Sequence, residues 1–256
     1  MKAPGRRSRA NDAVRRAGGC ALAQVLALVL GPVMLAGAAH AQVAGTLGID
    51  SVNRYRGVGT DDVGPVLRAS AMADTPWGAY GGISGLWRTR DAGLASVDAM
   101  LGWSGRLNAF SALDAVAPEW GWDAGVHRTH YGEGSQYDFT EAMVGLLAPD
   151  ASLRTWYAPR YFGTRTHTLY TELGANHAFD DHWRAFAHVG WLHYGPAPTY
   201  QARIGDRVDT LVGIGWTVDA WDLRLSRDGL VSGHARDDFD ARRRRAAWTL
   251  GGSVAF

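Results

Sequence analysis

The chain ends in the stretch R-A-A-W-T-L-G-G-S-V-A-F, residues 245–256. Counted back from the last residue, every second position is apolar, aromatic or glycine, and the residues between are small or weakly polar; these positions are Phe256, Val254, Gly252, Leu250 and Trp248. A period of two is typical of a β-strand with one apolar face. Because an exposed edge strand of this kind would tend to aggregate, the pattern favours a closed sheet. A closed antiparallel sheet with its apolar face outward is an outer-membrane β-barrel.

The first 41 residues have the pattern of a secretory signal peptide. Basic residues come first, an apolar run follows from Cys20 to Leu35, and Ala39-His40-Ala41 supplies a small-x-small cleavage site. The apolar run is shorter than the roughly 20 residues of a comfortable spanning helix. Cys20 begins the run, whereas a lipoprotein cysteine would follow it. We therefore expect a signal peptide over residues 1–41, no lipid anchor, and a β-barrel domain over residues 42–256.

Without this leader, the composition excludes several classes of function. The leader holds six of the 26 basic residues and one of the 25 acidic ones, which leaves 20 against 24 and a formal net charge of −4. The basic balance of the full chain is thus no argument for nucleic-acid binding. Since Cys20 is the single cysteine, the remainder can form neither a disulfide nor a thiolate metal site. No internal stretch is long enough for a spanning helix, so membrane crossing would require strands. We expect no cofactor.

After the leader, the chain divides into segments of about ten residues in which apolar and polar side chains alternate. In the clearest, Val97 and Leu101 share one face and Asp98 lies on the other, whereas a helix would place Asp98 beside Leu101. An even number of strands returns both termini to the periplasm. Residues 106–119 fit neither a strand nor a tight turn and are interpreted as a longer connection. We predict twelve strands, at residues 43–55, 65–74, 78–87, 95–104, 120–129, 137–147, 152–158, 167–175, 182–194, 208–217, 221–226 and 245–256.

The connections and the tryptophans support this division. Every second connection is long and charged, at residues 56–64, 88–94, 130–136, 159–166, 195–207 and 227–244, and most of the others are short. Aromatic residues gather at segment ends: Trp77, Trp103, Trp122, Trp183, Trp216, Trp221 and Phe256 at the expected periplasmic end, and Trp87, Trp191 and Trp248 at the other. Long outer loops and two aromatic rings are typical of outer-membrane barrels. A soluble sandwich or lipocalin-like barrel is the alternative, although its alternating face would carry larger residues than Ala and Gly.

The face opposite the apolar one carries charges of both signs and is the candidate functional site. One interpretation is a channel whose acidic and basic sides orient small polar solutes at a constriction. The other is an interior closed by Arg–carboxylate pairs between neighbouring strands, for example Glu172 with Arg184. The expected pore-lining residues are Asp50, Arg54, Arg68, Asp98, Asp123, Glu141, Arg154, Glu172, Arg184, Asp209, Asp222 and Arg224.

An outer-membrane lipid hydrolase is the alternative from another class of function, because some barrels use a Ser–His pair on the outer wall. The chain has no Gly-x-Ser-x-Gly sequence, and Ser84, Ser104 and Ser152 have no histidine expected beside them on the lipid side. His127 and His130 are three residues apart and would point to opposite faces of a strand. We therefore expect no catalytic residue and no metal site.

Two features suggest partners. The terminal positions Trp248, Leu250, Val254 and Phe256 are expected to be read by the machinery that assembles barrels into the outer membrane. Four arginines at residues 242–245 follow three aspartates and would suit lipopolysaccharide phosphates at the outer rim; pairing with those aspartates is the other interpretation. The remaining expected partners are outer-membrane lipid and small solutes, without nucleic acid.

Several short motifs resemble the TorF family of Gram-negative outer-membrane proteins. They are Tyr55-Arg56-Gly57-Val58-Gly59 with Pro65 after it, Gly78-Ala79-Tyr80-Gly81-Gly82, Asp98 with Gly102, Glu141, and the closing Phe256. The resemblance covers most of the chain after the leader. It departs from the family's pattern at residues 83–87, in the order of Trp and Ser, and at His130-Tyr131-Gly132, where a tyrosine-proline turn is common. The resemblance implies a channel in the outer membrane and brings no catalytic residues.

Overall fold

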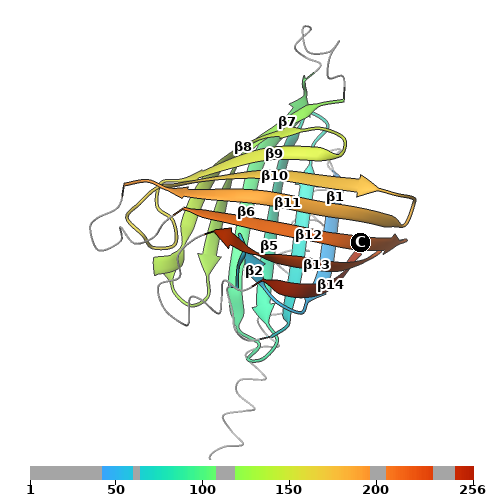
Figure 1. Ribbon diagram of the computed structural model, residues 1–256. Coiled ribbons are helices and arrows are strands. Elements are labelled where there is room, and N and C mark those ends of the chain that lie inside the picture. Colours follow the sequence, from blue (N-terminus) through green and yellow to red (C-terminus); the bar gives the residue numbers. More distant parts are fainter. Residues whose placement is uncertain (1–41, 60–63, 108–118, 197–205, 233–245) are drawn as a thin grey trace, which may run out of the picture.

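The protein is a single closed β-barrel, seen from the side in Figure 1. The computed structural model describes residues 42–59, 64–107, 119–196, 206–232 and 246–256. Neighbours in sequence pair antiparallel throughout, and β14 pairs with β1 to close the sheet, which confirms the prediction of a twelve-stranded antiparallel barrel. The barrel strands are β1 (Gln42–Asp50), β4 (Val66–Asp74), β5 (Ala79–Arg88), β6 (Leu94–Arg106), β7 (Gly121–Tyr131), β8 (Phe139–Leu147), β9 (Ala151–Ala158), β10 (Thr168–Ala178), β11 (Trp183–Tyr194), β12 (Arg207–Val218), β13 (Trp221–Ser232) and β14 (Ala247–Ala255).

The structure differs from the predicted pattern in three short elements and, most of all among the strand boundaries, at the ends of the first strand and of β13. The first strand ends at Asp50 rather than at Tyr55, and β2 (Arg54–Tyr55) and β3 (Val58–Gly59) form a separate two-stranded sheet. At the other end of the chain, β13 continues to Ser232, six residues beyond the predicted end of that strand. A short 3₁₀ helix, η2 (Ser135–Tyr137), precedes β8. No helix among the described residues is long and apolar enough to cross a membrane.

Apolar side chains cover the outside of the barrel and polar ones fill the inside. Leu101, Val144, Val212 and Leu250 are exposed, although a water-soluble fold would bury such residues. Their immediate neighbours along the strands point inward, since successive side chains of a strand alternate between faces. The exposed outer wall is therefore the surface that a hydrocarbon layer would cover.

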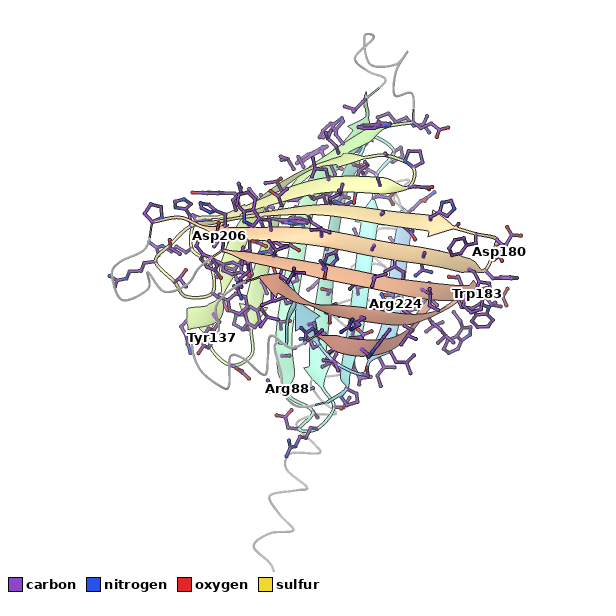
Figure 2. All side chains as sticks on the ribbon, in the orientation of Figure 1. Arg88, Tyr137, Asp180, Trp183, Asp206 and Arg224 are labelled. Carbon is purple, nitrogen blue, oxygen red and sulfur yellow. The ribbon has the colours of Figure 1, made fainter. Side chains whose placement is uncertain are left out.

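The two ends of the barrel differ. The end at which β1 begins and β14 finishes is called here the turn end. Its connections are short except for the one between β6 and β7, of which residues 108–118 lie outside the described residues. Tryptophans gather at this end: the rings of Trp77 and Trp103 lie 6.3 Å apart, and Trp183 is paired with Trp216. Figure 2 shows Asp180 and Trp183 together at this end. The Asp180 carboxylate accepts the N–H groups of His182 and Trp183 at 2.8 and 2.7 Å, which close the turn and lower the pKa of Asp180. The opposite end, with the long connections, is called the loop end.

The last residue takes part in closing the barrel. The Gly45 N–H donates to the Phe256 carbonyl at 2.9 Å, and the Phe256 N–H donates to the Gly45 carbonyl at 3.0 Å. A Cβ at Gly45 would lie 2.5 Å from the Phe256 ring, so the aromatic ring packs over this glycine. The chain terminus thus pairs with the first strand instead of leaving a free edge.

Candidate functional site in the barrel interior

A hairpin formed by β2 and β3 folds into the barrel at the loop end. In Figure 1, β2 lies among the barrel strands rather than beyond their ends. Tyr55 pairs with Val58, and the two residues of the turn, Arg56 and Gly57, have φ values of 49° and 72°. Positive φ at both central residues is the type I′ turn that suits tight hairpins. Glycine takes this conformation without cost, but for Arg56 it is strained by an estimated 1–2 kcal/mol, so other contacts must hold this residue in place.

Those contacts are made by the side chain of Arg56. Its Nη1 and Nη2 donate to the two oxygens of Glu141 on β8 at 2.9 and 2.8 Å, a bidentate pair. The guanidinium carbon lies 4.2 Å from the centre of the Tyr170 ring and 4.8 Å from that of Tyr55, within range for cation–π attraction. Trp156 and Tyr161 complete the aromatic surround at 5.8 and 5.5 Å. The strained turn residue is therefore fixed to the barrel wall.

A second arginine fixes the other side of the hairpin. Arg54 Nε lies 2.6 Å from Asp228 Oδ1 on β13, and Arg54 Nη2 donates to the Gly57 carbonyl at 2.5 Å. Gly57 itself packs so closely on the wall that a Cβ there would lie 2.5 Å from Asp209 Cβ. Asp228 and Glu141 belong to strands on nearly opposite sides of the closed sheet. The hairpin therefore spans the barrel interior, and its four charged anchors, here called the hairpin cluster, are Arg54, Arg56, Glu141 and Asp228.

The hairpin cluster is excluded from water. The exposed fractions of its four charged side chains lie between 5% and 9%. It adjoins an apolar and aromatic core that includes Phe139, Tyr161 and Leu192. Burial raises the pKa of Tyr161 to about 12 and holds the pKa of Tyr55 well above its usual value, so both phenols stay neutral. This half of the interior is packed like the core of a soluble protein.

A chain of alternating charges occupies a different part of the interior. Asp50 Oδ2 lies 3.3 Å from Arg68 Nη2, and Asp50 Oδ1 lies 3.3 Å from Arg224 Nη2. Arg224 Nε is 3.4 Å from Asp222 Oδ1, and Arg184 Nη1 is 2.6 Å from Asp222 Oδ2. We call these five residues the arginine ladder. Arg224 is labelled in Figure 2, on the inner side of the front strands. Arg68 and Arg224 remain 46% and 39% exposed, so the ladder faces open interior space.

Glycines between charged residues allow the charges to meet across an intervening strand. Along one row of paired residues the sequence is Arg184, Gly215, Arg224, Gly251 and Asp50. A Cβ at Gly251 would lie 2.3 Å from Asp50 Oδ1, and one at Gly215 would lie 2.7 Å from the Arg184 guanidinium carbon. Because Gly215 and Gly251 have no side chain, the long side chains on the strands beside each glycine can reach across it.

A second row repeats this arrangement from β7 to β12, nearer the loop end where it crosses β11 and β12. It contains, in paired order, Asp123, Gly145, Arg154, Glu172, Gly190 and Asp209. Arg154 Nε donates across Gly145 to Asp123 Oδ2 at 3.1 Å, and Tyr170 reaches past Gly190 to Asp209 Oδ1 at 3.3 Å. Glu172 lies 3.8 Å from His188, which is 2.9 Å from Asp209. Asp98, on β6, accepts a hydrogen bond from Thr129 at 2.8 Å.

The structure corrects two sequence-based expectations. Glu172 and Arg184 do not pair, because Glu172 lies opposite Gly190 and Arg184 lies opposite Ala178, at the other end of β10. Arg184 pairs with Asp222 instead. Arg54 does not line the wall as part of the first strand, because that strand ends four residues earlier and Arg54 enters the interior from the hairpin.

Sequence reasoning also missed two site residues. Arg56 was assigned to a connection, and Asp228 lay beyond the predicted end of its strand. The usable signal for Arg56 was the order Arg-Tyr-Arg-Gly at residues 54–57, in which a glycine ends a charged and aromatic run as a tight turn would require. The arginine run at residues 242–245 lies outside the described residues.

Three histidines of the described strands lie beside carboxylates. His130, His177 and His193 lie within 3.0 Å of the carboxylates of Asp138, Asp150 and Asp206. Within the described ranges, no group of three or more His, Cys, Asp and Glu residues could hold a metal ion.

Comparison with known proteins supports the fold. No protein-family model matches the sequence, and no curated protein matches it. Among solved structures, the chain is similar to the NanC porin with a TM-score of 0.55, at 10% identity over 84% of this chain and 99% of that one. It is similar to the KdgM porin with a TM-score of 0.52, at 10% identity over 83% of this chain and 99% of that one. At this level of identity the likeness concerns the architecture: this chain has the fold of porin-type outer-membrane barrels.

Proposed function

We propose that the protein is an outer-membrane channel for small polar or charged solutes, with the β2–β3 hairpin as its constriction. The observation that carries the proposal is the division of a closed barrel into an apolar outer wall and a charged interior, part of which stays exposed at the arginine ladder. A barrel that served only as a membrane anchor would need no such exposed charges. The fold shared with the NanC and KdgM porins supports the same conclusion, as does the resemblance to the TorF family.

The location and assembly of the protein form part of this proposal. Residues 1–41 would direct export and be removed after Ala41, and the short turns would face the periplasm. The assembly machinery would read the terminal strand, in which Phe256 also closes the barrel. Changing Phe256 to Asp should therefore reduce the amount of folded protein in the outer membrane, as measured by heat-modifiable mobility of membrane fractions; unchanged amounts would contradict this role.

A second candidate is a barrel whose interior is permanently closed. The water-excluded hairpin cluster favours it, because buried arginines held by carboxylates resist displacement. Single-channel recording separates the two functions: the purified protein is compared with a variant in which residues 54–59 are replaced by glycine and serine. The channel proposal expects conductance from both, larger in the variant. Conductance from the variant alone would identify a plugged barrel, and conductance from neither would overturn the channel.

A further inference from the structure

Charged residues are rare on the outer wall, and two arginines stand out there. Arginine occupies two outward-facing positions in the described barrel strands, Arg128 on β7 and Arg227 on β13, and no other. An arginine facing hydrocarbon at the midplane costs roughly 2–4 kcal/mol, and the cost falls toward zero near the interface. Arg128 differs from Arg227 in having polar partners beside it on the outer wall.

Arg128 belongs to a small polar group on the outer wall near the loop end. Its Nη1 donates to Thr140 Oγ1 on β8 at 3.1 Å, and its Nη2 lies 3.6 Å from Asp138 Oδ2. Two residues farther along β7, the ring of His130 lies 2.7 Å from the same oxygen. Tyr137, labelled in Figure 2, adjoins this group in the connection between β7 and β8.

The exposed fractions of these side chains show which of them face outward. Arg128 and His130 are 57% and 55% exposed, whereas the carboxylate of Asp138 is 8% exposed. Asp138 also accepts the Tyr131 N–H at 2.9 Å. Although burial would raise it, the hydrogen bonds from His130 and Tyr131 keep the pKa of Asp138 below its usual value. The Asp138 carboxylate holds the side chains of Arg128 and His130, and these two side chains, not the carboxylate, face the surroundings.

We propose that Arg128, His130 and Thr140 form a binding site for a phosphate group on the headgroup of an outer-leaflet glycolipid. The group faces away from the interior, so it is not part of the solute path. It lies toward the loop end, where long connections place the outer surface in barrels of this kind. The Arg128 guanidinium matches the charge and the acceptors of a phosphomonoester, and the His130 ring and the Thr140 hydroxyl place further polar groups beside it. The strand neighbour of Arg128 on the β6 side is Ala99, which leaves room above the guanidinium.

The proposal rests on the outer-membrane location proposed above but not on channel activity. Arg227 provides a matched control, because it is also an exposed, outward-facing arginine but pairs with Trp248 and Val212, which offer no hydroxyl or histidine beside it. The two arginines lie on opposite sides of the closed sheet and cannot hold the same headgroup. Removing either charge from a lipid-facing wall should not hinder folding.

The test measures lipid retained by the purified barrel. Mature protein is incorporated into phosphatidylcholine nanodiscs with bisphosphorylated or dephosphorylated lipid A, and the lipid A retained after detergent washing is quantified by native mass spectrometry. Retention of bisphosphorylated lipid A should fall roughly tenfold in Arg128→Gln, the size expected for losing one charge-assisted hydrogen bond. Arg128→Lys should recover part of the retention and Arg227→Gln should resemble the parent.

Three outcomes would overturn the site. The first is that the parent retains dephosphorylated lipid A as well as the bisphosphorylated form. The second is that Arg227→Gln loses as much retained lipid A as Arg128→Gln. The third is that the double variant Arg128→Gln with His130→Gln retains as much lipid A as the parent. Conductance is recorded on the same variants. An unchanged conductance with lost lipid retention supports a site separate from the channel, whereas absence of conductance in every sample, the parent included, would count against the proposed function and leave the lipid result standing.

Discussion

The hairpin cluster and the arginine ladder pair arginine with carboxylate in two different environments. In the hairpin cluster the four charged side chains are almost completely buried, and the Arg56–Glu141 pair is bidentate. In the ladder, Arg68 and Arg224 are partly exposed, and each lies 3.3 Å from Asp50 through a single nitrogen. The charged groups of the hairpin cluster use their hydrogen-bonding atoms on each other. The arginines of the ladder keep N–H donors that can bind water or a solute.

The difference follows from where each set lies in the chain. The ladder residues come from barrel strands, whose pairing fixes their positions, and glycines on intervening strands give them room. The hairpin residues Arg54 and Arg56 come from a connection. Among the described residues, the hairpin forms its own two-stranded sheet and is not paired through its backbone with the barrel strands. The ion pairs of the Arg54 and Arg56 side chains must therefore attach the hairpin to the wall. This role fits the burial of these side chains and the short distances to their carboxylates.

The largest effect is expected from breaking the hairpin cluster. Changing Glu141 to Ala leaves the Arg56 guanidinium buried without its carboxylate, and breaking such a pair costs about 3–5 kcal/mol. The measurement is the free energy of unfolding in urea for protein folded into liposomes. Replacing both Arg56 and Glu141 by Met should recover most of the stability, since two apolar side chains leave no unpaired charge. A Glu141→Ala protein as stable as the parent would show that the hairpin is not held in this way.

An intermediate effect is expected where a side chain is added to the ladder. In Gly251→Val, the new Cβ would lie 2.3 Å from Asp50 Oδ1, so Asp50 and its arginines must move. Overpacking of this kind costs about 1–3 kcal/mol. The adjacent Gly252 faces outward, and a Cβ there would lie 3.2 Å from the end of the Leu223 side chain and 4.0 Å from the Asp222 carbonyl oxygen, so Gly252→Ala serves as the control. If the two variants lose the same stability in urea, the glycine in the row has no special part in the ladder.

The barrel itself could be predicted from the sequence because its determinants are local. Alternation with a period of two identifies each strand, and the alternate long and short connections order the strands around the barrel. The inward face followed from the same alternation, so Asp98, Asp123 and Arg224 were placed on the correct side from their neighbours alone. Closure by Phe256 followed from the need to remove a free edge.

Partners across the barrel could not be predicted, because they depend on register. A shift of two residues between β10 and β11 keeps every side chain on its face but changes every pair, so alternation gave no reason to prefer Asp222 over Glu172 for Arg184. The hairpin was missed for another reason. Its fold depends on two long-range ion pairs. Arg56 pairs with Glu141, which is 85 residues farther along the chain, and Arg54 pairs with Asp228, which is farther still.

The smallest effect on stability is expected at the exposed end of the ladder, where the effect on transport should be clear. Changing Arg68 to Ala breaks an ion pair in which the arginine is nearly half exposed, so the cost in stability should be about 0–1 kcal/mol. Asp50 keeps Arg224 as its partner. Removal of a positive charge from the interior should nevertheless favour cations, which reversal potentials in a salt gradient would measure. Arg68→Lys retains the charge and should keep the selectivity of the parent. If Arg68→Ala destabilised the barrel as much as Glu141→Ala while selectivity stayed constant, the ladder would be a structural device like the hairpin cluster, and the solute path would have to lie elsewhere.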